Sequence, residues 1–322
     1  MKRIIKMICV SAILMTVMTG CVPKNKNVVV TNYPVQFLFE RLAGDRVNVQ
    51  RIDKGSVPQR ATIDPNYQEI LKNADAIFYI NELQPYWEMY RDVMSDNSKI
   101  EMVDLAEKST LYRFQRYTTS EISGQVVTTE SPYYDGIKPE DVDLYENDPF
   151  LWMDPLAMTS MARSIKDWLD VTYPDERKTF ETRFNELEVE LTDLQAHYNK
   201  LKSNHKPIRV VTMTPSFGNW QKSYKVEVYP MTISRYGVLP DEAALKEIRA
   251  RIIADDVRYI AYEEGMPDDY VKLFNQLKTE LDLKTINLSS VYTLTDAEMK
   301  DKQTYIYKMY QNLETLETIA AQ

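Results

Sequence analysis

From residue 28 onward, short runs of β-branched and other apolar residues alternate with stretches whose apolar residues recur every three or four positions. The short runs are typical of buried strands, and the longer stretches are typical of amphipathic helices. Strands are expected at 28–31, 47–52, 76–80 and 100–105, and again at 208–213, 226–229, 257–262 and 284–288. Because strands and helices alternate, the sequence predicts two α/β lobes, each a mainly parallel sheet with helices on both faces.

One helical stretch is much longer than the others. Its apolar residues follow each other from Phe180 to Leu201 at spacings of four and three, which predicts a single amphipathic helix. At about 1.5 Å per residue, a helix over 176–203 spans on the order of 40 Å. The expected organisation is therefore an N-terminal lobe over 28–175, this linking helix, and a C-terminal lobe over 204–322.

Residues 109–148 interrupt the pattern. They are rich in Ser, Thr, Tyr, Gly and acidic residues and show little apolar periodicity. A connection of this length is uncommon in a compact domain unless it has a function of its own. We therefore expect an insertion or a lid within the N-terminal lobe, with an acidic end.

The insertion ends at the segment Asn147–Pro155, which reads NDPFLWMDP. Asp154 followed by Pro155 predicts a helix N-cap with a proline at the first helical position, where the missing N–H costs nothing. Apolar residues at helical spacing follow, so a helix is expected to begin here.

The first twenty residues have a different character. A positively charged start precedes an apolar run over 7–18, which is too short to cross a membrane and is typical of a signal peptide. Small residues stand directly before Cys21 and resemble the lipobox at which bacterial lipoproteins are cut and acylated. The sequence predicts a signal peptide over 1–20, a lipid on Cys21 and a polar tether over 21–27. The mature protein is then anchored to the bilayer at the extracytoplasmic face of the cell membrane.

Removal of the signal peptide takes away three positive charges and no negative ones, which changes the formal net charge from -9 to -12. So acidic a chain argues against a nucleic-acid partner, since such partners call for a basic face. Cys21 becomes the only cysteine, and this excludes a disulfide framework or a thiolate metal site. A monomer is expected.

Motifs for catalysis are absent from the sequence. It has no glycine-rich phosphate loop and no glycine-serine-glycine nucleophile elbow. Its two histidines, His197 and His205, have no second histidine or cysteine at ligand spacing. An enzyme is therefore not expected.

Several motifs in order along the chain resemble the zinc and manganese solute-binding lipoproteins of bacterial ABC importers. They are VVTNYP at 29–34, LAGDRV at 42–47, NADAIFY at 73–79, DPFLWMDP at 148–155, VT at 211–212 with FG at 217–218, and the closing helix at 305–316. The family's corresponding motifs include Asp-Pro-His-x-Trp-Leu-Asp-Pro and Val-Thr-x-His-x-x-Phe-Gly. The resemblance implies two α/β lobes bridged by a rigid helix, a ligand cleft between them, zinc or manganese as the ligand, and the importer's membrane subunits as partners.

The sequence departs from the family at the four positions where the resemblance places metal ligands. Gln59 stands in the family's Pro-His pair, Phe150 in its Asp-Pro-His motif, Thr214 in its Val-Thr-x-His motif, and Asn287 at its late aspartate. Phenylalanine has no lone pair, and neutral amide and hydroxyl oxygens bind these metals far less well than imidazole and carboxylate. Arg60 and Trp152 are further candidates for the lining of the cleft.

Three functional hypotheses follow. The first is a divergent solute-binding lipoprotein with weak or no zinc and manganese binding and a non-metal or altered ligand. The second is a metal-uptake binding protein that uses replacement carboxylates, such as Glu263 or Glu264 and the acidic end of the insertion. The third is a surface lipoprotein that keeps the fold as a scaffold for contacts with a partner protein.

Overall fold

The computed structural model describes residues 25–95, 99–123, 125–137, 142–203 and 207–321. The predicted signal peptide, Cys21 and the start of the tether lie outside these residues. Within the described part of the chain, none of the helices has the length and apolar character needed to cross a membrane.

The first lobe is built on a parallel sheet with strand order β2-β1-β5-β6. Its strands are β1 (Lys26–Val30), β2 (Val47–Arg51), β5 (Ala76–Tyr79) and β6 (Glu101–Asp104), and its helices are α2 (Tyr33–Ala43), α3 (Tyr67–Lys72) and α4 (Tyr86–Ser95). A two-stranded ribbon of β3 (Asp53–Lys54) and β4 (Thr62–Ile63) flanks the short 3-10 turn η3 (Pro58–Arg60).

The second lobe repeats this plan with strand order β10-β9-β11-β12, again parallel. Its strands are β9 (Ile208–Thr212), β10 (Val226–Pro230), β11 (Tyr259–Glu263) and β12 (Lys284–Leu288). Its helices are α7 (Asn219–Tyr224), α8 (Glu242–Ala254), α9 (Asp268–Glu280), α10 (Asp296–Lys300) and α11 (Tyr305–Ala320). The prediction of two α/β lobes with mainly parallel sheets is confirmed.

The loops that follow the strands of the two sheets meet between the lobes. The backbone N–H of Tyr33, just after β1, donates to the carbonyl of Tyr292, just after β12 (3.1 Å). Ligands of parallel α/β sheets bind at the carboxyl ends of the strands. The region between the lobes is therefore where a ligand site is expected.

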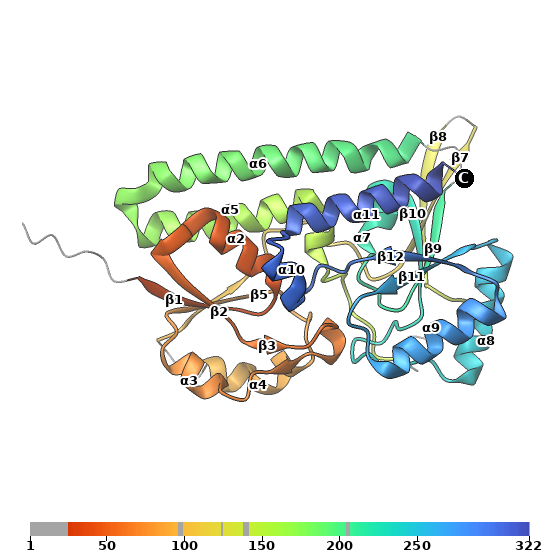
Figure 1. Ribbon diagram of the computed structural model, residues 1–322, viewed down its shortest axis with the longest axis horizontal. Coiled ribbons are helices and arrows are strands. Elements are labelled where there is room, and N and C mark those ends of the chain that lie inside the picture. Colours follow the sequence, from red (N-terminus) through yellow and green to blue (C-terminus); the bar gives the residue numbers. More distant parts are fainter. Residues whose placement is uncertain (1–24, 96–98, 124, 138–141, 204–206, 322) are drawn as a thin grey trace, which may run out of the picture.

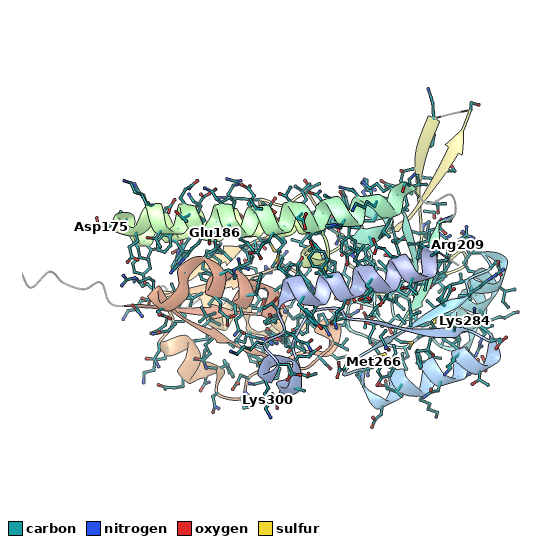
Figure 2. All side chains as sticks on the ribbon, turned by 45° about the horizontal axis from the view of Figure 1, so that its top comes forward. Asp175, Glu186, Arg209, Met266, Lys284 and Lys300 are labelled. Atoms are coloured by element: carbon teal, nitrogen blue, oxygen red, sulfur yellow. The ribbon has the colours of Figure 1, made fainter. Side chains whose placement is uncertain are left out.

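Two antiparallel helices lie along one side of the molecule; the longer one runs past both lobes, and the shorter one lies beside the first lobe (Figure 1). They are α5 (Pro155–Thr172) and α6 (Arg177–Lys200), and α6 continues into the 3-10 turn η7 (Leu201–Ser203). α6 contacts a helix of each lobe, because Arg41 of α2 pairs with Glu190 (2.6 Å) and Tyr198 Oη donates to the carbonyl of Met309 in α11 (2.8 Å). Figure 2 shows the side chains along α6 from Asp175 past Glu186.

The helix entry predicted at Asp154 is confirmed. The Asp154 carboxylate accepts a hydrogen bond from the backbone N–H of Leu156 (2.9 Å), and Pro155 is the first helical residue of α5. This N-cap fixes the direction in which the chain leaves the NDPFLWMDP segment.

The insertion contains regular structure that its composition does not predict. Strands β7 (Arg116–Ile122) and β8 (Gln125–Ser131) form an antiparallel hairpin, whose tip projects away from the body of the molecule (Figure 1). Arg116 at its base is buried and contacts Asp255 (2.8 Å) and Tyr229 Oη (3.0 Å). The insertion is therefore fixed to the second lobe, although it interrupts the first.

Candidate functional site

The NDPFLWMDP segment lies between the lobes and is bonded to the second lobe along its length. The carbonyl of Phe150 accepts from Asn219 Nδ2 (3.1 Å), that of Trp152 from Tyr305 Oη (2.5 Å), and that of Met153 from Trp220 Nε1 (2.9 Å). These donors come from α7 and α11, so the two helices hold the segment in place.

Phe150 is completely buried, with 0% exposure. Its ring packs edge-to-face against Tyr145 and Trp152, with centroid distances of 5.9 and 5.7 Å. Such aromatic pairs stabilise a core beyond simple area burial. The Phe150 side chain is therefore packed into the protein interior against two other aromatic rings.

Trp152 is also buried, and its indole Nε1 donates to the carbonyl of Ser290 (2.7 Å). Its ring lies 6.2 Å from that of Tyr292. The predicted cleft residue Trp152 thus faces the loop after β12.

Gln59 in η3 is buried, with 1% exposure. Among the described residues, neither its Oε1 nor its Nε2 has a hydrogen-bond partner. Buried amides are nearly always paired, so an unpaired one calls for a water molecule or a ligand group beside it.

Thr214 follows β9, is buried, and contacts Glu263 at the end of β11. One Glu263 oxygen accepts from the backbone N–H groups of Met213 (2.8 Å) and Thr214 (3.0 Å). The other lies 2.5 Å from Thr214 Oγ1, which is also 2.8 Å from Ser216 Oγ. Thr214 can donate its one proton to Glu263 and accept from the hydroxyl of Ser216, so both contacts of Thr214 are satisfied.

Burial raises the pKa of Glu263 to about 7, although the three donors around it oppose this shift. The neighbouring Glu264 is exposed, as expected for adjacent residues at the end of a strand. Of the two replacement carboxylates considered from the sequence, only Glu263 is therefore turned into the protein interior.

Asp148 is a second buried carboxyl, and burial also raises its pKa to about 7. It accepts from the backbone N–H of Phe150 (2.9 Å). A Cβ on Gly218 would stand 2.2 Å from Asp148 Oδ2, so the close approach of these two segments requires glycine at position 218. The sequence pattern gave no sign that Asp148 is buried, because it ends an acidic run.

Asn287 is the only one of the four candidate positions whose side chain is exposed. It is exposed on β12 and lies beside Tyr262 in the register of β11, and Tyr262 packs against Phe274 of α9 (5.6 Å). Side chains alternate along a strand, so Asn287 and Tyr262 share the face opposite to Glu263. This placement corrects the expectation that Asn287 lines the cleft.

Arg60 reaches from the first lobe to the second. Its guanidinium donates twice to the carbonyl of Gly237 (2.9 and 2.8 Å) and once to Asp269 (2.8 Å), and it lies 4.3 Å from the ring centroid of Tyr270. Its donors are engaged by protein groups of the second lobe, so Arg60 ties the two lobes together.

Two more contacts join the lobes directly. Ser56 Oγ donates to the carbonyl of Gly265 (2.5 Å), and Glu88 of α4 pairs with Arg235 (2.8 Å). Together with Arg60 they form what we call the interlobe latch. The two lobes are thus held against each other by protein atoms alone.

No group of three or more His, Cys, Asp or Glu side chains within the described ranges is arranged to hold a metal ion. His197 is exposed on α6 beside the carbonyl of Asp193 (3.1 Å), and His205 lies outside the described residues. The carboxyls nearest the candidate positions, Asp148 and Glu263, are each held by backbone N–H groups.

The chain matches the family model ZnuA, described as the periplasmic component A of the zinc-uptake complex, over residues 28–319. It is 26% identical over 296 residues to the zinc-binding lipoprotein AdcA of Streptococcus pneumoniae (strain ATCC BAA-255 / R6). That match covers 90% of this chain and 55% of AdcA. The chain thus spans about half the length of the curated relatives it matches.

Solved structures agree with the fold. The Zn(II)-bound ZnuA-like domain of S. pneumoniae AdcA superposes with a TM-score of 0.68 at 24% identity, covering 92% of this chain and 100% of that domain. The periplasmic zinc binding protein TroA from Treponema pallidum gives 0.71 at 18% identity, with 92% and 100% coverage. With the family model matched over nearly all of the mature sequence, the chain belongs to the ZnuA family of periplasmic zinc-uptake components.

Proposed function

We propose that the protein is an extracytoplasmic solute-binding lipoprotein of a metal-type ABC importer, and that its cleft binds zinc and manganese weakly or not at all. The family assignment supports the first part. The second part rests above all on Phe150, which occupies the family's histidine position and is completely buried.

An ion placed next to the Phe150 ring would lose its water shell without gaining a ligand there. Neutral oxygens from Gln59 and Thr214 cannot offset that loss. The transfer of an ion from water into a protein interior costs on the order of several kcal/mol or more. The aromatic packing around Phe150 also leaves its ring no room to move aside without breaking its contacts to Tyr145 and Trp152.

Replacement carboxylates are the alternative way to bind a metal. Glu263 and Asp148 are the buried candidates, but each already accepts backbone hydrogen bonds and has a pKa raised to about 7 by burial. A metal would have to displace both a proton and existing hydrogen bonds. We therefore rank this alternative second.

The unpaired amide of Gln59 supports a ligand other than a metal. A buried amide that has neither a donor nor an acceptor beside it is costly to keep. A small polar solute that both donates and accepts would satisfy Oε1 and Nε2 together. Opening of the interlobe latch would give such a solute access.

A contact role for the insertion is a separate candidate function, favoured by the hairpin tip that projects from the body (Figure 1). Importer genes beside the gene for this protein would favour the solute-binding function. Their absence would favour the contact role.

Calorimetry on the chelator-treated mature protein is expected to show no zinc or manganese binding tighter than about micromolar, because the candidate positions offer no charged ligand. The S. pneumoniae AdcA protein is the positive control. Nanomolar binding of one metal per chain would contradict the proposal and favour replacement carboxylates.

Substitution of Cys21 by alanine is expected to abolish incorporation of labelled lipid and to release the protein from the membrane. Stable retention by acyl groups takes more than one chain, as bacterial lipoproteins carry. Fractionation of cells that express the wild type and the variant measures this. Retention of the alanine variant in the membrane fraction would show that the anchor is elsewhere.

A further inference from the structure

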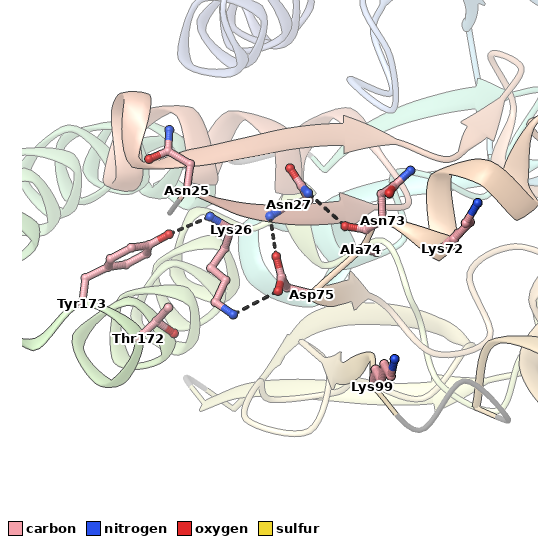
Figure 3. Close-up of a pocket in the computed structure, with 10 residues that line it drawn as sticks. All are labelled: Asn25, Lys26, Asn27, Lys72, Asn73, Ala74, Asp75, Lys99, Thr172 and Tyr173. Atoms are coloured by element: carbon pink, nitrogen blue, oxygen red, sulfur yellow. Dashed lines mark hydrogen bonds and ion pairs between the residues drawn. The ribbon is translucent and has the colours of Figure 1, made fainter. Parts of the chain in front are cut away.

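A pocket of about 560 Å³ opens at the amino ends of β1 and β5, at the edge of the first sheet opposite to the second lobe. Figure 3 shows the ten side chains that line it. They are Asn25, Lys26, Asn27, Lys72, Asn73, Ala74, Asp75, Lys99, Thr172 and Tyr173. No candidate position of the interlobe site is among them.

The pocket is basic in a protein that is acidic as a whole. Lys26, Lys72 and Lys99 come from three separate segments, and Asp75 is the only acidic residue in the lining. Asp75 pairs with Lys26 (2.9 Å) and accepts from the backbone N–H of Asn27 (2.9 Å). Lys72 and Lys99, both exposed, are added to this balanced pair, and among the described residues Lys72 has only a long, exposed ion pair with Glu69 of its own helix (3.8 Å).

The rest of the lining is polar and fixed by hydrogen bonds. Tyr173 Oη accepts from the backbone N–H of Lys26 (2.9 Å) and donates to the carbonyl of Arg46 (2.8 Å). Asn27 Nδ2 donates to the carbonyl of Asn73 (2.9 Å). Hydrogen bonds therefore hold the polar groups of the lining in place, which would not be the case for lysines spread at random over a surface.

The corresponding edge of the second sheet provides a contrast. The pocket there contains Arg209, Arg258 and Lys284, but Arg209 pairs with Glu227 (2.8 Å) and Arg258 with Asp256 (2.8 Å). Figure 2 shows Arg209 and Lys284 at the opposite end of the molecule from Asp175, which follows the pocket residue Tyr173 by two positions.

The position of the pocket along the chain suggests its ligand. Asn25 in the lining is four positions after Cys21, and a fully extended chain covers at most about 3.6 Å per position. A lipid on Cys21 would hold the pocket within about 14 Å of the membrane surface. This upper limit lets the lysines come within a Debye length of about 10 Å from the surface, where they are attracted to anionic lipids.

We propose that this pocket binds the phosphate of an anionic membrane lipid headgroup, and so sets how the first lobe stands on the membrane. The inference rests on the lipid anchor at Cys21 that is part of the proposed function. The ammonium groups would pair with the phosphate, and the second amide hydrogens of Asn25 and Asn27, whose first ones donate to protein carbonyls, would donate to its oxygens.

The test attaches the mature chain through Cys21, its only cysteine, to a maleimide lipid in vesicles. One set of vesicles is phosphatidylcholine and the other is a mixture of phosphatidylcholine and phosphatidylglycerol. Acetylation of each lysine by a water-soluble reagent is followed by mass spectrometry. On the anionic vesicles, Lys26, Lys72 and Lys99 are expected to react about fivefold more slowly than on the neutral ones, whereas Lys284 and Lys300 keep their rates.

Two double variants with the same change in net charge test whether the protection depends on the lysines of the pocket. Lys72→Glu with Lys99→Glu is expected to abolish the protection of Lys26, whereas Lys284→Glu with Lys300→Glu should leave it unchanged. All four lysines are exposed, so both variants are expected to fold, and circular dichroism checks this. The proposal would be overturned if both variants lost the protection of Lys26 from acetylation equally. It would also be overturned if the wild type showed no protection on anionic vesicles.

A further experiment distinguishes binding to a membrane lipid from binding to free anions. Inorganic phosphate added to the unanchored chain is expected to protect these lysines little, and full protection by phosphate alone would overturn the assignment to a lipid. Because the anchor is attached chemically, the outcome does not depend on lipid modification in cells. The Cys21→Ala fractionation tests that modification independently.

Discussion

Replacement of Gln59, Phe150 and Thr214 together by histidine is expected to raise the affinity for zinc at least about a thousandfold over the wild type. Three imidazoles would then stand at the positions where the family has its ligands, and the bulk of the Phe150 ring would be replaced by a donor. The buried Glu263 beside Thr214 could supply a carboxylate, because zinc binding favours the loss of its proton. Calorimetry with zinc, or competition with a chromophoric chelator, measures the gain.

Asn287 provides the matched control for this variant. Addition of Asn287→Asp to the three histidines is expected to produce no further gain in affinity, because Asn287 is exposed on the face shared with Tyr262. A large gain in zinc affinity from Asn287→Asp would show that the side chain at position 287 faces the metal site in solution. A triple variant that folds but still fails to bind zinc would mean that surrounding groups no longer orient the ligands.

The second large effect concerns pH. Burial raises the pKa of Glu263 from its ordinary value of 4.5 to about 7, so the folded protein keeps a proton that the unfolded chain loses over this range. The stability that this proton contributes is fully present below pH 4.5 and is lost as the pH rises to 7. A shift of this size corresponds to about 3 kcal/mol.

Glu263→Gln should remove this pH dependence because glutamine stays neutral. The free energy of unfolding of the wild type, relative to the variant, is expected to fall by about 3 kcal/mol between pH 4.5 and pH 8. Urea unfolding at several pH values measures it, and Glu264→Gln at the exposed neighbouring position is the control. The same pH dependence in the wild type and in Glu263→Gln would contradict a buried protonated carboxyl.

The sequence was sufficient for the fold because each element carries its own local signal. The four-three spacing from Phe180 to Leu201 defines one helix, and six of the residues that it places inward are buried in α6. The Asp154-Pro155 pair likewise specifies the start of α5 through a bond within three residues. Local signals of this kind do not require knowledge of distant partners.

The candidate site could be predicted only in part, since its features depend on contacts between distant segments. The resemblance located Gln59, Phe150 and Thr214, which are all buried. The position of Asn287 was missed because a shift of one residue along a strand turns a side chain to the other face. The role of Arg60 was hidden as well, because its partners Gly237 and Asp269 lie more than 170 positions away.

The hairpin of the insertion was missed for another reason. Thr, Ser and Glu are frequent in β7 and β8, and four consecutive side chains of β8, at 127–130, are exposed and so belong to both faces of the strand. A ribbon without a buried face has no alternation of apolar and polar residues. Only its Thr and Val content favours strands, and this signal is weaker than periodicity.

The interlobe latch limits the ways in which ligand binding could change the arrangement of the lobes. Arg60, Ser56 and Glu88 bring the lobes together through bonds to the protein itself. A ligand shifts a conformational equilibrium only to the extent that it prefers one state over the other. Because the latch contacts already join the lobes, a ligand that kept them would change the outline of the protein little, and a ligand that broke them would signal its binding by opening the lobes.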